Sequence, residues 1–120
     1  MNDKDDLTLL IQALQKREQI LINGESVKKY NRYFDTMRKY ARNLIANNHQ
    51  EELLPYLECD SVSIRRDMAG LLFHCYPEKC RSVLKEIAEM SVENGLPTCL
   101  VNVSVSAKMA LEIGIPKDFP

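Results

Sequence analysis

Apolar residues recur at steps of three and four positions along most of this 120-residue sequence. This spacing follows the α-helical period of about 3.6 residues, whereas a half-buried strand would alternate apolar and polar residues. Breaks in the pattern coincide with residues that end helices, such as Asn23-Gly24 and Asn94-Gly95, or that begin them, such as Pro77. The chain is therefore expected to be all-α, with about six helices.

We expect one domain over residues 1–120, because this length is typical of a single domain. The pattern predicts an N-terminal helix within residues 1–25 and a loose tail at 116–120. Pro55 should shorten or kink the third helix, and the valines of 101–105 are expected in a helix because no partner strand is predicted. The expected helices span approximately residues 5–23, 26–47, 50–58, 62–74, 77–93 and 96–113.

No stretch of the sequence resembles a targeting or membrane-spanning segment. The first six residues are acidic and polar, and they lack the basic and apolar regions of a secretory signal. No apolar run approaches the roughly 20 residues that a bilayer requires. A cytoplasmic location is expected, and reduced thiols in the core are expected for the four cysteines, which lack paired spacing. They are Cys59, Cys75, Cys80 and Cys99.

The sequence offers little for catalysis or for holding a metal or cofactor. His74 and Cys75 are adjacent, so on a helix they point about 100° apart and cannot form a reactive pair on their own. A zinc site from His74, Cys75, Cys80 and Cys99 is conceivable, but the short paired spacings of structural zinc sites are missing. The simpler interpretation makes Cys75 and Cys80 small core residues and His74 a helix-end residue. We expect no enzymatic activity and no cofactor.

Two parts of the sequence show a similar helical pattern. Leu54, Leu57, Ala69 and Leu72 are echoed by Leu84, Ile87, Ala107 and Ala110, at offsets of 30 and 38 residues. Helical hairpins that repeat in this way stack around a continuous core. The stretch from Leu53 to Ala69 resembles a HEAT repeat, with a leucine-rich helix, a turn containing Asp60 and a second helix carrying Val62 and alanine. This resemblance implies a short HEAT- or armadillo-like α-solenoid.

Net charge argues against nucleic acid as the general partner. The 16 basic and 17 acidic side chains leave a charge of −1, whereas proteins that neutralise phosphates usually carry a basic excess. One segment departs from the average: residues 26–48 hold six cations and one carboxylate.

Two sets of charged residues are candidate binding surfaces. The acidic surface comprises Glu51, Glu52, Glu58, Asp60, Glu86, Glu89 and Glu93, and it could dock a basic partner. The basic surface comprises Lys28, Arg32, Lys39 and Arg42, interleaved with Tyr30, Tyr33 and Tyr40, a combination that can track a nucleic-acid strand. For each surface the simpler interpretation is an ordinary solvated helix face.

More narrowly, residues 26–115 resemble small bacterial HEAT-like proteins, through Lys29 to Arg32, Tyr76-Pro77 and Leu96-Pro97. That group includes immunity proteins of toxin–immunity pairs. The resemblance implies a protein-binding module, an inhibitor that blocks the active site of a toxin such as a nuclease. The alternatives are a nucleic-acid-binding module using residues 28–42 and a general interaction scaffold. We expect another protein as the partner, no membrane association, and a monomer or weak oligomer.

Overall fold

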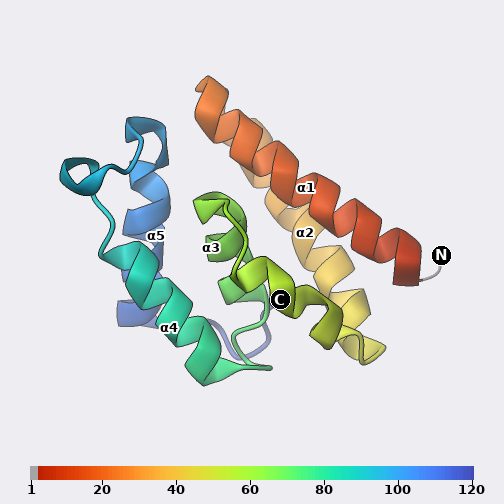
Figure 1. The fold of residues 1–120 in the computed structure, drawn as a ribbon. Helices are drawn as coiled ribbons and strands as arrows, with labels where there is room; N and C mark the ends of the chain where they lie inside the picture. The colour runs from red at the N-terminus through yellow and green to blue at the C-terminus, as the bar shows by residue number, and fades with distance from the viewer. Residues whose placement is uncertain (1–2) are drawn as a thin grey trace.

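The computed structural model describes residues 3–120, and this part of the chain contains helices and no strand. The described helices confirm the all-α class (Figure 1). The five α-helices are α1 Asp3–Asn23, α2 Val27–Ala46, α3 Val62–Leu71, α4 Pro77–Ala88 and α5 Val101–Ile113. Three 3-10 segments join them: η1 Gln50–Leu57, η2 Val92–Asn94 and η3 Thr98–Leu100.

Local sequence signals account for most of the helix ends. Gly24 has a φ of +64° after α1, a conformation that glycine adopts without strain. The side chains of Ser26 and Ser61 cap α2 and α3 by accepting hydrogen bonds from the main-chain N–H three residues later, at 3.2 and 3.0 Å. Pro77 lies in the first turn of α4, where the N–H it lacks is not needed.

The structure differs from the expected helix boundaries in several places. The segment around Pro55 is the 3-10 helix η1 rather than an α-helix, in keeping with a proline that cannot donate an internal hydrogen bond. α3 ends at Leu71 and not near residue 74, and residues 72–75 form a turn that leads to Pro77. α4 ends at Ala88 and not near residue 93, and the last α-helix begins at Val101 and not near residue 96, after the 3-10 segment η3. The valines of 101–105 are helical as expected.

α3 is the central element of the fold. α1 and α2 pack side by side as a long hairpin, α4 and α5 pack as a second pair, and α3 contacts α1, η1, α4 and α5 (Figure 1). Seven of the ten residues of α3 are buried. The largest fully buried side chains are Leu10, Leu14, Met37, Leu44, Leu53, Leu57, Met68, Leu71, Leu72, Leu84, Ile87 and Cys80. Stacking of these pairs as a HEAT-like solenoid stays a prediction.

The segment expected to be a loose tail is packed against the helices. The Phe119 ring lies 5.9 Å from that of Phe34, measured between centroids. Arg42 Nε donates to the main-chain oxygen of Pro120 at 2.8 Å, and His74 Nε2 lies 2.7 Å from that of Pro116. Since a carbonyl oxygen only accepts, His74 donates in this contact. A segment this short shows no periodicity, so its single aromatic anchor gave no pattern signal.

No helix formed by the described residues combines the length and the apolar character required to cross a membrane.

Candidate functional site

A buried ion pair connects the N-terminal hairpin to α3. Arg17 of α1 and Asp67 of α3 form two hydrogen bonds, Nε to Oδ2 at 3.0 Å and Nη2 to Oδ1 at 3.3 Å. Their side chains are only 5% and 6% exposed. Burial raises the pKa of the Asp67 carboxyl, and the charge and hydrogen bonds of Arg17 act against that rise. The pair therefore links two segments that are 50 residues apart in the sequence. Because both side chains are buried, solvent screens their attraction only weakly.

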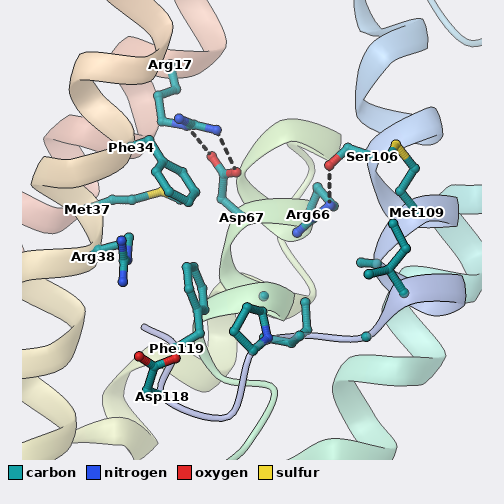
Figure 2. Close-up of a pocket in the computed structure, with 16 residues that line it drawn as sticks. Arg17, Phe34, Met37, Arg38, Arg66, Asp67, Ser106, Met109, Asp118 and Phe119 are labelled. Carbon is teal, nitrogen blue, oxygen red and sulfur yellow. Dashed lines mark hydrogen bonds and ion pairs between the residues drawn. The ribbon is translucent and has the colours of Figure 1, made fainter.

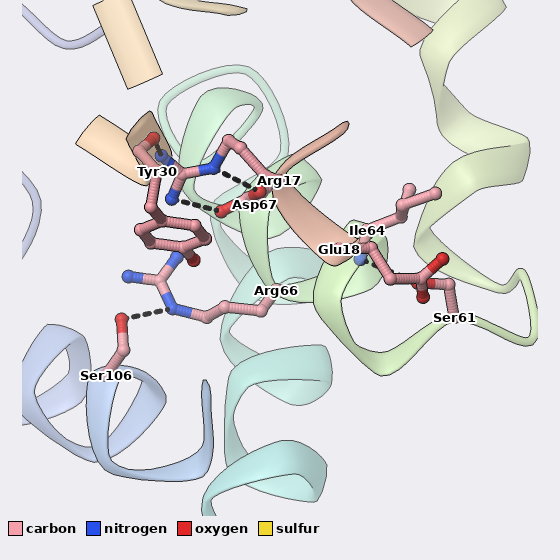
Figure 3. A network of polar contacts seen from close by, with 8 residues as sticks. All are labelled: Arg17, Glu18, Tyr30, Ser61, Ile64, Arg66, Asp67 and Ser106. Atoms are coloured by element: carbon pink, nitrogen blue, oxygen red, sulfur yellow. Dashed lines mark hydrogen bonds and ion pairs between the residues drawn. The ribbon is translucent and has the colours of Figure 1, made fainter. Parts of the chain in front are cut away.

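Aromatic rings complete the environment of Arg17. Its Nη1 donates to the main-chain oxygen of Tyr30 at 3.0 Å, and its guanidinium lies 3.8 Å from the centroid of the Tyr30 ring. The same guanidinium lies 5.3 Å from the centroid of the Phe34 ring. Burial is the main cause of a raised pKa at the Tyr30 hydroxyl, with the charge of Asp67 contributing next. Figure 3 shows this network, in which α1, α2 and α3 each supply a group.

A second arginine extends the polar layer toward α5. Arg66 Nε donates to Ser106 Oγ at 3.0 Å, and this is the one hydrogen bond recorded for Arg66 within residues 3–120. Burial lowers the pKa of the Arg66 guanidinium, and Asp67 opposes that effect. A Cβ placed on Gly70 would stand 3.0 Å from Arg66 Nη1. The glycine thus leaves room for this guanidinium.

These groups border a groove of about 640 Å³ between α2, α3, α5 and the segment after α5 (Figure 2). One wall contains Phe34 and Arg38 of α2, and another contains Met109 and Ile113 of α5. Phe119 lies at the base of the view. Most of the lining is apolar, and the cationic groups project into it from α1, α2 and α3. Small-molecule sites share this composition and size.

Sequence reasoning did not identify this groove, although one signal was present. On α1, Arg17 lies on the stripe of Leu10 and Leu14, all three of which are buried. On α3, Asp67 is likewise buried beside Met68. A charged residue on an apolar stripe indicates a buried ion pair, because an unpaired charge there would be costly. The stripe alone does not say which residue is the partner.

The acidic surface lies on η1, on the turn before α3, and on α4 and η2. All seven of its carboxylates are exposed. Burial raises the pKa of Tyr76, the residue before α4, and the charge of Glu51 raises that pKa further. Glu86 forms an ion pair with Arg65 at 3.1 Å, and Glu52 lies 3.2 Å from Nδ1 of His49.

The C-terminal end of α4 also borders a shallow groove of about 350 Å³. Glu86 and Glu89 contribute to its lining. The other lining residues are mostly apolar or small: Val62, Met90, Asn94, Gly95, Leu96 and Pro97. This part of the acidic surface therefore combines an apolar centre with negative charge.

The basic surface is a continuous exposed stripe on α2. Lys28, Arg32, Lys39 and Arg42 are exposed, and at about 100° per residue they fall within about 80° of the helix circumference. Asp35 is exposed within the same arc. The tyrosines do not share it: Tyr30 covers Arg17, and Tyr33 and Tyr40 border a groove shared with α1. Lys39 Nζ nevertheless lies 5.4 Å from the centroid of the Tyr40 ring. One ring thus accompanies the stripe, which is fewer than a surface that stacks successive bases requires.

The cysteines differ in exposure, contrary to the expectation of four core thiols. Cys80 is buried, Cys59 and Cys75 are half-buried, and Cys99 is exposed. Burial, and secondarily the nearby Cys75, raise the pKa of the Cys80 thiol to about 12. Among the described residues, His, Cys, Asp and Glu side chains form no group of three that could hold a metal ion.

Comparison with known proteins gives a fold and no activity. No family model and no curated protein matches the sequence. Among solved structures, the protein RPA1889 from Rhodopseudomonas palustris CGA009 is similar, with a TM-score of 0.73 and 23% sequence identity. The match covers 94% of this chain and 88% of that chain. At this identity the likeness concerns the fold alone, so the HEAT-like assignment stays a prediction.

Proposed function

We propose that this chain is a protein-binding module that docks a basic partner through its acidic surface, and that it acts by binding rather than by catalysis. The observation that carries the proposal is the exposure of all seven carboxylates together with the apolar groove beside Glu86 and Glu89. Negative charge steers a basic partner and raises its association rate.

The groove at the end of α4 supplies the other half of an interface. Protein interfaces combine a desolvated, largely apolar centre with a polar rim. Val62, Met90 and Leu96 provide apolar atoms at the groove, and Glu86 and Glu89 border them. An aromatic or aliphatic side chain of a basic partner, flanked by lysine or arginine, fits this combination.

The resemblance to small HEAT-like proteins extends the proposal to an inhibitor. A toxin that cleaves nucleic acid has a basic substrate channel, because it must hold phosphates. A surface with seven carboxylates could occupy such a channel and exclude the substrate. The proposed partner is accordingly a basic toxin encoded next to this chain, with the chain as its immunity protein.

The experiment is a binding titration of the chain with the protein encoded by the adjacent gene. We expect a complex in the nanomolar range at low salt and a progressive loss of affinity as salt rises. The variant Glu89→Lys/Glu93→Lys should bind at least about tenfold more weakly, since like charges at an interface are costly.

A matched control is Asp35→Lys/Glu112→Lys, which changes the net charge equally at exposed positions on α2 and α5. This control should bind as the natural chain does. Equal effects of the two double variants would show that total charge matters and the acidic surface does not. Absence of binding at micromolar concentration would refute the proposed partner.

A further inference from the structure

The groove between α2, α3 and α5 contains positive charge that the fold does not use. Each of the three guanidinium nitrogens of Arg17 donates a hydrogen bond, two of them to Asp67 and one to the main-chain oxygen of Tyr30. Arg66, in contrast, donates only from Nε, and its two terminal nitrogens have no hydrogen-bond partner within residues 3–120. Neither of these nitrogens belongs to the fully buried atoms that lack a partner, so both are accessible to solvent. The terminal nitrogens of Arg66 are therefore available to a ligand.

Arg38 adds a second cation on the opposite wall. Its guanidinium lies 5.8 Å from the centroid of Phe34 and 5.1 Å from that of Phe119. Its Nε is buried and has no hydrogen-bond partner in the described part of the chain. Figure 2 shows Arg38 on the α2 side and Arg66 on the α3 side, with Phe119 below. The two guanidiniums thus flank one space.

The rest of the groove is apolar and open to solvent. Met109 and Ile113 of α5 are 51% and 76% exposed, although both are large apolar residues. They border the groove together with Phe34, Ile115 and Phe119. The volume of about 640 Å³ lies within the range of small-molecule sites, roughly 300–1,000 Å³. An apolar ligand body would cover these side chains.

We infer that this groove binds a small organic monocarboxylate with an apolar body, such as a medium-chain fatty acid or an arylalkanoic acid. The carboxylate accepts hydrogen bonds from Arg66, and the apolar body lies along Met109, Ile113 and Phe119.

The net charge of the residues that line the groove favours a ligand with a single negative charge. Asp67 neutralises Arg17, which leaves Arg38 and Arg66 as cations among the lining residues, with Asp118 as the remaining carboxylate. The net excess is one positive charge. The planar fork of a guanidinium matches the geometry of a carboxylate. The groove offers no further cation for the additional charges of a polyanion, and its net positive charge would repel an amine.

The inference is tested by titrating the whole chain with sodium octanoate, using calorimetry and the arginine Nε–H signals in the ¹H–¹⁵N spectrum. We expect saturable one-to-one binding of octanoate and a shift of the Arg66 signal. Acetate, which lacks the apolar body, and octylammonium, which has the opposite charge, should both bind far more weakly.

Two variants separate the ligand site from general adsorption. Arg66→Gln should weaken octanoate binding by about 10- to 100-fold, the usual effect of losing charge-assisted hydrogen bonds. Gly70→Ala keeps every charge and places a methyl group 3.0 Å from Arg66 Nη1, so it should also weaken binding. The matched control Lys108→Gln removes an exposed charge of α5 that does not border the groove, and it should bind as the natural chain does.

Folding of each variant is checked by circular dichroism. If Arg66→Gln does not fold, Gly70→Ala alone tests whether octanoate binds at the groove. Binding of octanoate that is unaffected by Gly70→Ala and by Arg66→Gln would overturn the inference. So would equal binding of octan-1-ol, or no binding at millimolar concentration. The acidic surface plays no part in this test, so its outcome is independent of the proposed protein partner.

Discussion

Asp67→Asn removes the charge of a buried ion pair while keeping the size of the side chain. Arg17 then keeps its positive charge although its side chain is only 5% exposed. It formed two hydrogen bonds with Asp67, at 3.0 and 3.3 Å, and in the variant one of its N–H groups meets an amide NH₂ in place of a carboxylate oxygen. Breaking one side of a buried pair typically costs about 3–5 kcal/mol. For a chain of this length total stability is roughly 6–18 kcal/mol, so the loss is a large fraction.

The assay is urea unfolding followed by circular dichroism. Asp67→Asn should lower the free energy of unfolding by about 3–5 kcal/mol. The control is Glu25→Gln, which breaks the exposed pair between Glu25 and Lys29 and should leave the unfolding midpoint nearly unchanged. Arg17→Met/Asp67→Leu removes both charges and should recover much of the stability lost in Asp67→Asn. The reasoning is refuted if Asp67→Asn and Glu25→Gln have equal effects.

Other residues give further predictions. Phe119→Ala should cost about 1–2 kcal/mol in urea unfolding, less than a fully buried phenylalanine, because the ring is half-buried; an unchanged midpoint would indicate a loose segment. With a thiol reagent at pH 8, Cys99 should react quickly and Cys80 only on unfolding; equal rates would contradict the burial. Between pH 9 and about 12 the folded chain keeps the Cys80 proton that the unfolded chain releases, so stability falls as pH rises. Cys80→Ala should flatten this part of the stability profile, and an unaltered slope would count against the raised pKa.

The sequence predicted the helices well because each depends on local signals. Gly24 and Ser61 stop and cap helices through their own backbone and side-chain chemistry. Pro55 signalled an irregular element, and η1 is a 3-10 helix. The boundaries after Leu71 and Ala88 depend on how the chain turns to pack, which periodicity does not encode.

The groove was not predicted, because it depends on contacts between distant segments. The partners Arg17 and Asp67 are 50 positions apart, and Arg66 and Ser106 are 40 apart. A single charged residue on an apolar stripe indicates that it must be paired, but it does not identify the partner residue. The segment ending in Phe119, which completes the groove, is too short to show a pattern.

The acidic residues were predicted as a candidate surface from their positions in the sequence. The structure leaves all seven exposed, on or beside η1, the turn before α3, α4 and η2. Their role as a docking surface stays a prediction. The basic residues on α2 are equally exposed, so exposure does not decide between the two surfaces. Of the three tyrosines, Tyr40 lies beside the cation Lys39, whereas Tyr30 covers Arg17 and Tyr33 borders the groove shared with α1, which disfavours base stacking on the basic surface.

The most direct test of the proposed function is to map main-chain amide shifts in the ¹H–¹⁵N spectrum while the protein encoded by the adjacent gene is added. The account predicts that the largest shifts occur in η1 and at the C-terminal end of α4, around Glu89 and Glu93, with residues 28–42 unaffected. Shifts concentrated on residues 28–42, with none near Glu89, would contradict it.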